Sequence, residues 1–174
     1  MIKEVSEISK NVSAKEISSK TKAFENANKD VKQPPRHIAT INENLKGQTV
    51  PGTNVEYKSH TFKANGELVE GVFPKFQPVA EVRIPPMFYK ASDTTQFELC
   101  TKSLQARIER DPSLASKFTP RQLEQIKNGN PRISGLTWHH NEVPGKMQLV
   151  DADVHARCRH TGGRSIWGGG GECR

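Results

Sequence analysis

The chain has 174 residues, and with 33% hydrophobic residues and a mean hydropathy of −0.70 it has the length of one domain with a modest core. It contains no apolar run long enough to cross a bilayer and no apolar segment typical of a signal peptide, so a membrane-spanning protein is excluded and any export signal is expected elsewhere, on a longer parent protein. The net charge of +7 and the pI of about 9.4 suit a polyanionic partner, although the basic residues are spread along the chain and give only mild support for nucleic acid.

The first part of the chain is polar and only weakly periodic. Residues 1–32 are interpreted as a linker or a marginal helix that ends at Pro34-Pro35, because proline cannot continue a helix. Residues 36–53 are expected to form an irregular connection. We therefore assign 1–54 to an N-terminal linker or entry segment, weakly helical or partly disordered, and 55–174 to the folded domain.

Strand patterns begin at Val55. Residues 55–63 and 67–73 flank Asn65-Gly66, a pair that accepts the positive φ angles of a tight turn, so this segment predicts a β-hairpin. Residues 79–85 are expected to add a third strand, which ends at the two prolines that follow.

The pattern changes to helical spacing from Asp93 onward. Apolar residues then recur every three or four positions, at Phe97, Cys100, Leu104 and Ile108. A second helix has strong boundary signals: Thr119 as N-cap, Gln122 to complete a capping box and Gly129 at its end. Asp111-Pro112 is expected to open a shorter helical turn between the two.

The three cysteines, Cys100, Cys158 and Cys173, have no regular spacing. No CxxC pair occurs, so a thiolate zinc site is not expected. A disulfide between Cys158 and Cys173 is compatible with an oxidising compartment, but free thiols are the preferred interpretation.

Four of the six histidines lie between His139 and His160, near the end of the sequence, and clustered histidines often bind metal. Residues 133–139 and 147–150 are predicted to be short strands joined by a loop. Because neighbouring residues of a strand point to opposite faces, His139 and His140 cannot have the same role if the strand is regular.

A short helix is predicted after the second of these strands. Asp151 or Asp153 can cap it, and it would carry Val154, His155 and Arg157. The predicted fold class is α+β: a small antiparallel β region and helices, followed by a C-terminal ββα unit that bears the histidines.

The histidine segment contains three short motifs at compact spacing: Trp-His-His at 138–140, Met-Gln-Leu-Val at 147–150 and His-Thr-Gly-Gly at 160–163. In this respect the chain resembles the WHH group of the HNH/endonuclease VII nuclease superfamily. The resemblance extends over residues 55–174 and is densest over 135–169. It implies a ββα-metal fold and a C-terminal toxin domain of a bacterial polymorphic or contact-dependent inhibition effector.

The resemblance also implies roles for individual residues. His140 would be the general base that activates water, while His139, His155 and His160 would hold one divalent metal ion, Zn or Ni, or Mg or Mn in turnover. Gln148 stands where HNH enzymes usually carry asparagine, and is expected to orient the loop or the base. The basic residues expected at phosphate are Lys146, Arg157, Arg159 and Arg164, with Arg164 preferred because Gly162-Gly163 leaves the backbone open beside it.

Two details of this segment remain open at the level of sequence. His155 and His160 are five residues apart, so His160 can join the metal only if the helix ends near Arg159 and the chain bends back. Otherwise water would take this position and His160 would contact phosphate. Trp138 is expected in the core, Trp167 in the core or against a base, and Gly168–Gly171 in a flexible tail rather than a phosphate-binding loop.

Together these features predict a metal-dependent endonuclease toxin that hydrolyses DNA with little sequence specificity. It would belong to a secreted or cell-surface effector, act in the cytoplasm of a target bacterium and be neutralised by an acidic cognate immunity protein. Two alternatives remain. One is an RNase toxin that uses His140 and His155 as acid and base without metal. The other is a zinc-stabilised nucleic-acid-binding module in which the histidines are structural.

Overall fold

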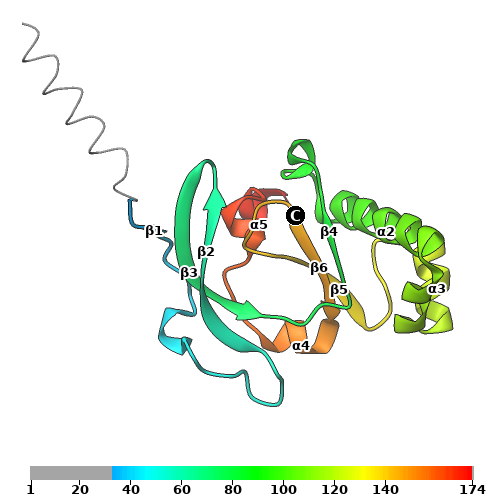
Figure 1. Cartoon of the computed structure of the whole chain (residues 1–174), viewed down its shortest axis with the longest axis horizontal. Helices are drawn as coiled ribbons and strands as arrows, with labels where there is room; N and C mark the ends of the chain where they lie inside the picture. The colour runs from blue at the N-terminus through cyan, green and yellow to red at the C-terminus, as the bar shows by residue number, and fades with distance from the viewer. Residues whose placement is uncertain (1–32, 174) are drawn as a thin grey trace, which may run out of the picture. The chain divides into compact units, whose positions relative to one another are not determined.

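A computed structural model describes residues 33–173, and most of them belong to one compact unit, Pro35–Arg174. The linker or marginal helix expected over residues 1–32 lies outside the described residues. Within the described part, no helix combines the length and the apolar character that a membrane span requires. The fold class is α+β, as predicted: two small sheets, with helices packed beside them (Figure 1).

The first sheet is built on the predicted hairpin. β2 (Glu56–Ala64) and β3 (Glu67–Lys75) pair in antiparallel fashion, and Asn65 and Gly66 turn the chain with φ angles of 52° and 84°. The two-residue strand β1 (Arg36–His37) adds to β3 in parallel. The segment expected to be an irregular connection thus contains β1 and one 3-10 turn, η1 (Glu43–Leu45).

The second sheet carries the histidine segment. Its strands are β4 (Ala80–Arg83), β5 (Leu136–His140) and β6 (Lys146–Asp151), in the antiparallel order β4-β6-β5. The helix α4 (Ala152–Arg157) follows β6 directly, and its N-cap Asp151 accepts a hydrogen bond from the Val154 amide. β5, β6 and α4 therefore form the ββα unit that the sequence predicted.

Two helices pack against the second sheet. They are α2 (Asp93–Arg110) and α3 (Pro120–Lys127), with the 3-10 segments η2 (Pro86–Phe88) and η3 (Pro112–Lys117) beside α2 in the sequence. The capping box of Thr119 and Gln122 forms as predicted. Cys100 and Leu104 of α2 are buried in one cluster with Trp138 of β5. In Figure 1 these helices and the β2–β3 hairpin lie on opposite sides of the second sheet.

The C-terminal residues differ from the predicted flexible tail. They form α5 (Gly163–Ile166) and η4 (Gly170–Cys173), and Gly168 between them is buried. Trp167 is a core residue whose indole donates a 2.8 Å hydrogen bond to the Asn141 carbonyl. The run of glycines resembled a tail in the sequence, but its first two members, Gly168 and Gly169, leave room for the close packing of Arg164 and Cys173. All three cysteines are free thiols.

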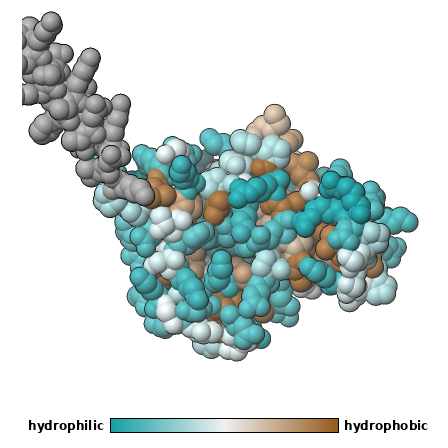
Figure 2. Space-filling view, viewed as in Figure 1, coloured by the Kyte–Doolittle hydropathy of each residue, from teal (hydrophilic) through white to brown (hydrophobic). Residues whose placement is uncertain are grey.

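The surface is mainly hydrophilic. Figure 2 shows apolar residues in small separate groups on the face that it presents. Among the described residues, the large hydrophobic side chains with high exposure are Ile41 (63%), Leu68 (43%) and Met87 (82%).

Candidate metal centre and active-site pocket

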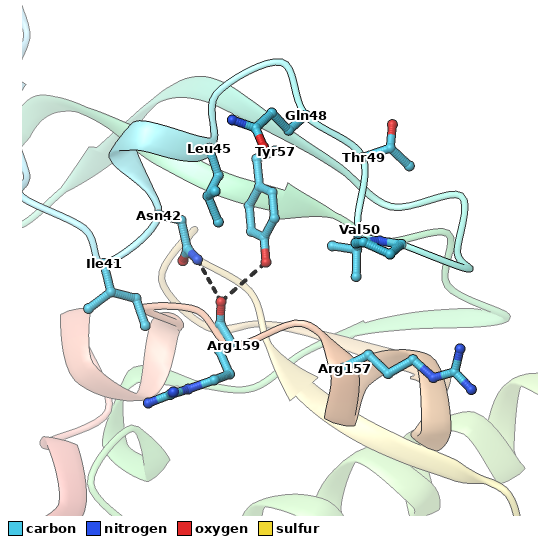
Figure 3. A pocket seen from close by; sticks show the side chains of 10 residues that line it. Ile41, Asn42, Leu45, Gln48, Thr49, Val50, Tyr57, Arg157 and Arg159 are labelled. Carbon is cyan, nitrogen blue, oxygen red and sulfur yellow. Dashed lines mark hydrogen bonds between the residues drawn. The ribbon is translucent and has the colours of Figure 1, made fainter.

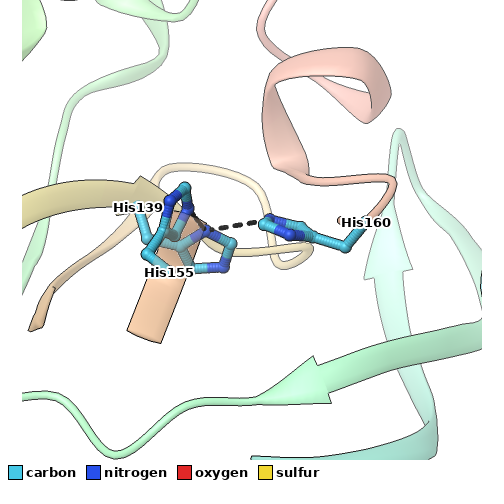
Figure 4. Close-up of side chains that lie close together, drawn as sticks. All are labelled: His139, His155 and His160. Carbon is cyan, nitrogen blue, oxygen red and sulfur yellow. Dashed lines mark hydrogen bonds between the residues drawn. The ribbon is translucent and has the colours of Figure 1, made fainter. Parts of the chain in front are cut away.

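Three histidines converge from three different elements. His139 lies on β5, His155 on α4 and His160 in the loop that joins α4 to α5 (Figure 4). His139 Nδ1 is 3.2 Å from His155 Nε2 and 3.3 Å from His160 Nε2. One nitrogen from each ring lies within 4.8 Å of the others, so this group could hold a metal ion.

The spacing of these nitrogens fits a tetrahedral metal. Zinc–nitrogen bonds of about 2.0–2.1 Å place two ligand nitrogens about 3.3–3.4 Å apart in a tetrahedral site. The two measured separations, 3.2 Å and 3.3 Å, share His139 Nδ1, which has one site for either a proton or a lone pair. The three ring nitrogens therefore cannot all satisfy one another by hydrogen bonding, and a cation at their centre would satisfy all of them.

The protonation of the three rings also suits a metal. Burial, reinforced by the neighbouring imidazoles, holds the pKa of His139 well below its usual value and lowers that of His155 to about 4. Burial likewise lowers the pKa of His160. Neutral imidazole is the form that binds a metal. His160 Nδ1 donates to the Cys158 carbonyl, which leaves the Nε2 lone pair facing the other rings, as in most metal-binding histidines.

Phe76 closes one side of the group. Its ring centroid lies 4.7 Å from that of His139, 5.4 Å from His155 and 5.6 Å from His160, and only 4% of the residue is exposed. This apolar wall restricts the rotamers of the imidazoles and excludes water on that side.

His140 lines the same pocket as the three convergent histidines. The pocket has a volume of about 290 Å³ and opens between β5, the start of α2 and the loop before α5. Its lining residues are Asp93, Phe97, Arg132, Thr137, Trp138, His139, His140, His155, His160, Gly162, Arg164 and Ser165. His140 is only 7% exposed and contacts the rings of Phe97 and Trp167.

Gln96 fixes the tautomer of His140. The amide nitrogen of Gln96 donates to the carbonyls of Phe88 (2.7 Å) and Tyr89 (2.8 Å), so its Oε1 must face His140, where it lies 2.5 Å from Nε2. An amide oxygen only accepts, so His140 Nε2 carries a proton, and in the neutral ring Nδ1 is the basic nitrogen. Asp93 Oδ1 lies 3.8 Å from the same Nε2.

The loop that contains His160 is held by hydrogen bonds to the residues on either side of His160. The Asn42 side chain donates a 2.6 Å hydrogen bond to the Arg159 carbonyl, and the Tyr57 hydroxyl contacts the same oxygen at 3.3 Å. On the other side of His160, the Ile41 amide donates to Thr161 Oγ1 at 3.2 Å. These contacts set the bend that His160 needs after α4 ends at Arg157.

Gln148 lies opposite His139 in the β5–β6 pairing. Its side chain accepts a hydrogen bond from Asn141 (3.2 Å) and donates one to Glu81 Oε1 (2.6 Å). These contacts tie the loop after β5 to β4, so Gln148 holds the loop that follows His140.

Arg164 lies in the pocket wall but in another environment than the one expected. The residue is 5% exposed, and its guanidinium donates to the carbonyls of Ala91 at 3.1 Å and of Cys173, while its Nε lies 3.2 Å from Asp93 Oδ1. The backbone beside it is closed rather than open, because a methyl group on Gly163 would overlap the Asn141 carbonyl. In this arrangement Arg164 ties the C-terminus to the start of α2.

The other three predicted basic residues do not line the histidine pocket. Lys146 forms a 2.9 Å ion pair with Glu81, and Arg157 and Arg159 are exposed at a second pocket (Figure 3). The structure instead brings Arg132, an exposed residue in the turn before β5, to the wall of the histidine pocket.

Sequence reasoning missed Asp93, Gln96, Arg132 and Phe76. The first two lie in the first turn of α2, about 45 residues before His140, and only the tertiary fold brings them to it. Gln96 carried one signal: it is a polar residue on the face of α2 that carries the apolar Cys100 and Leu104, and a polar side chain in such a place needs a buried partner.

The fold and this pocket define a ββα unit whose imidazoles could bind a metal beside a further buried histidine. A family model described as the DNase/tRNase domain of colicin-like bacteriocin matches residues 65–162, which is 98 of the 174 residues. The chain therefore belongs to this family and is a nuclease toxin domain. The matched segment includes all four histidines of the pocket. Comparisons with curated proteins and with solved structures gave no significant match.

Proposed function

We propose that this domain is a metal-dependent endonuclease of the WHH type, with His139, His155 and His160 as metal ligands and His140 as general base. One observation carries the proposal: three imidazole nitrogens converge within 4.8 Å of one another in a pocket that His140 also lines. A divalent cation held there would supply a Lewis acid for the scissile phosphate and its leaving oxygen.

His140 would accept the proton of the attacking water on Nδ1. Gln96 keeps the other ring nitrogen protonated, so the imidazole presents its lone pair from a fixed ring orientation. The carboxylate of Asp93, whose Oδ1 is 3.8 Å from Nε2, would then stabilise the positive charge of the protonated ring. Arg164 holds that carboxylate in place through its own 3.2 Å contact.

Arg132 is our candidate for the phosphate contact at this pocket, because it is the exposed cation of the wall. Gln148 acts by holding the Asn141 loop. Contacts of this kind are made to the sugar–phosphate backbone and not to the base edges. Cleavage of DNA with little sequence preference is therefore the expected activity.

The biological setting follows from the family. Colicin-like nucleases are toxins, so we infer that this domain is part of a secreted or cell-surface effector used in interbacterial competition, including contact-dependent or polymorphic toxin systems. It would act in the cytoplasm of the target cell. The net charge of +7 favours an acidic cognate immunity protein, because opposite charge accelerates association and covers the nucleic-acid surface.

Cleavage of supercoiled plasmid tests this proposal. Purified protein is incubated with plasmid and, separately, with RNA, each with Mg²⁺, Mn²⁺ or Zn²⁺, or with EDTA. We expect metal-dependent plasmid cleavage, and a loss of about 10²–10⁴-fold in rate in His140→Ala with the fold and metal binding intact. His37→Ala, which removes an exposed histidine of β1, is the matched control and should cleave normally.

Three results would contradict the proposal. Cleavage that survives complete chelation would support the metal-independent RNase chemistry instead. A His140→Ala protein that binds metal, is folded and still cleaves at the normal rate would remove His140 from the reaction. If His140→Ala instead lowered thermal stability as much as loss of a metal ligand does, the histidines would be structural.

A further inference from the structure

A second pocket lies beside the loop of His160, outside the machinery proposed above. It has a volume of about 510 Å³, within the range of about 300–1,000 Å³ typical of small-molecule sites. Its walls are the 41–51 segment, Tyr57 and the two arginines that flank Cys158 (Figure 3). The 41–57 part of these walls precedes residues 65–162, the segment that the family model matches.

The lining of this pocket suits a flat, partly polar ligand with negative charge at its edges. Leu45, Val50 and the Tyr57 ring give an apolar surface, and Gln48 and Asn42 add amide groups. None of the described residues that line it is acidic, and Arg157 and Arg159 supply positive charge. Ile41, 63% exposed, adds an apolar side chain at the edge of the pocket.

The two arginines reach toward opposite ends of one side of the pocket. In Figure 3 their side chains extend in opposite directions along one side of the pocket, from the end of α4 and from the loop after it. An internal nucleotide has one phosphate on each side of its base. A base seated between the arginines would therefore present a phosphate to each guanidinium.

The pocket is also joined to the proposed metal centre. Arg159 immediately precedes His160, and consecutive Cα atoms are about 3.8 Å apart. The Arg159 carbonyl is the atom that Asn42 and Tyr57 of the pocket wall hold. A phosphate bound by the Arg159 side chain would thus lie near the histidine pocket, one residue along the chain from a proposed metal ligand.

We infer that this second pocket binds the base of one unpaired nucleotide of the substrate, next to the phosphate that is cleaved, with Arg157 and Arg159 on the flanking phosphates. This inference rests on the proposed nuclease function and adds a preference for single-stranded or locally unpaired substrate. A base inside a pocket cannot stay stacked and paired in a duplex. Apolar and aromatic surfaces that cover a base contribute affinity for any base, so little sequence preference is expected.

Binding measured without turnover tests the inference. Fluorescence anisotropy of the EDTA-treated 174-residue protein is followed with a fluorescein-labelled 12-nucleotide strand, as DNA and as RNA, with the matching duplex and with a strand that lacks its central base. We expect the single strands to bind at least fivefold more tightly than the duplex. Arg157→Gln/Arg159→Gln should weaken binding about tenfold and lower the salt dependence of log K by about one to two.

Two further variants distinguish the contribution of the base to binding from the contribution of the phosphates. Thr49→Trp fills the pocket from an exposed wall position and should weaken the intact strand about threefold or more, without changing the salt dependence or the affinity for the abasic strand. Arg121→Gln, at an exposed arginine of α3, is the matched control and should change binding less than twofold. Circular dichroism melts establish that each variant is folded.

The outcomes separate this inference from the function on which it rests. If the arginine pair and Thr49→Trp bind like Arg121→Gln while plasmid is still cleaved, the pocket has no part in substrate binding and only the inference fails. Equal affinity for duplex and single strand would also overturn it. If no strand binds and no plasmid is cleaved, the proposed nuclease function fails as well.

Discussion

Gln96 and His140 meet in the core beside the histidine pocket, with the amide oxygen of Gln96 2.5 Å from His140 Nε2. The contact is directional, because two backbone carbonyls bind the amide nitrogen of Gln96 and prevent the amide from turning over. A residue on α2 therefore determines which nitrogen of a β5 histidine is basic. The orientation of the proposed base depends on how the helix packs on the sheet.

Replacing Gln96 by leucine should separate this orientation from metal binding. Gln96→Leu removes the acceptor for His140 Nε2 and one of the two donors to each of the Phe88 and Tyr89 carbonyls, which keep the Ala91 amide and the Arg164 guanidinium, at a cost of about 1–3 kcal/mol in stability. We expect the cleavage rate to fall about 10–100-fold, the range found when the partner that orients an imidazole is lost in a metal site. Metal affinity, measured by calorimetry, should be unchanged.

Thr101→Val is the matched control for this variant. Thr101 is a buried polar residue of the same helix and accepts a 3.1 Å hydrogen bond from the Trp138 indole, so its loss also destabilises the core. It does not contact His140, and its cleavage rate should stay near normal. Equal cleavage by folded Gln96→Leu and Thr101→Val would show that Gln96 is structural only.

The ββα unit could be predicted because its signals are local. Strand alternation, the caps and the turn residues lie within a few positions of one another, and His139 and His155 follow from them. The convergence of His160 could not be predicted in the same way. Its position depends on Asn42 and Ile41, more than 110 residues earlier in the chain, which hold the residues on either side of it.

The roles expected for the arginines show a second limit of local reasoning. Sequence proximity to the histidines suggested that Arg157, Arg159 and Arg164 would lie at the scissile phosphate. The fold turns the first two toward a different pocket and buries the third against backbone carbonyls. The glycines before Arg164 suggested an open backbone, yet they serve close packing, and the two meanings cannot be told apart without the partner surface.

Asn42→Ala should weaken metal binding although Asn42 lies in neither the ββα unit nor the histidine pocket. Without its 2.6 Å hydrogen bond the Arg159 carbonyl is held less firmly, and His160 loses part of its preorganisation. We expect zinc or nickel affinity in a chelator-competition assay to fall about 5–10-fold. Asn44→Ala, on an exposed neighbour in η1, should bind metal normally, and identical affinities for the two variants would rule out this coupling.

Acid should destabilise the metal-free protein. The three convergent histidines have pKa values below 6.5 in the folded state, about 4 for His155, whereas in the unfolded chain they titrate near 6.5. The unfolded state therefore binds more protons between these limits, so stability rises with pH up to about 6.5 and then levels off. Below pH 6.5, the free energy of unfolding changes by at most about 1.4 kcal/mol per pH unit for each histidine.

Urea unfolding of EDTA-treated protein at pH 7.5 and pH 5.5 measures this effect. The unfolding midpoint should fall at the lower pH, and the fall should be smaller in His155→Ala because one of the buried imidazoles is gone. Equal midpoints at the two pH values for the wild-type protein would mean that the rings are not held neutral in the fold.

Gly163 tests whether the glycines after His160 serve packing or flexibility. A methyl group there would overlap the Asn141 carbonyl and the Trp167 indole nitrogen, which share a 2.8 Å hydrogen bond. Because the first of these is backbone, the strain cannot be relieved by a side-chain rotation, and Gly163→Ala should cost about 3 kcal/mol or more. For a domain of this size the melting temperature should fall by roughly 6–12 °C.

Gly171→Ala is the matched control, since a methyl group at Gly171 meets nothing within 4 Å and the residue needs no positive φ. Its melting temperature should change by no more than about 1–2 °C. Asn141 directly follows His140, so in the Gly163→Ala protein that remains folded the displaced carbonyl should also shift the proposed base and slow plasmid cleavage. If both variants melt alike, the close contact between α5 and the residue that follows β5 does not contribute to stability.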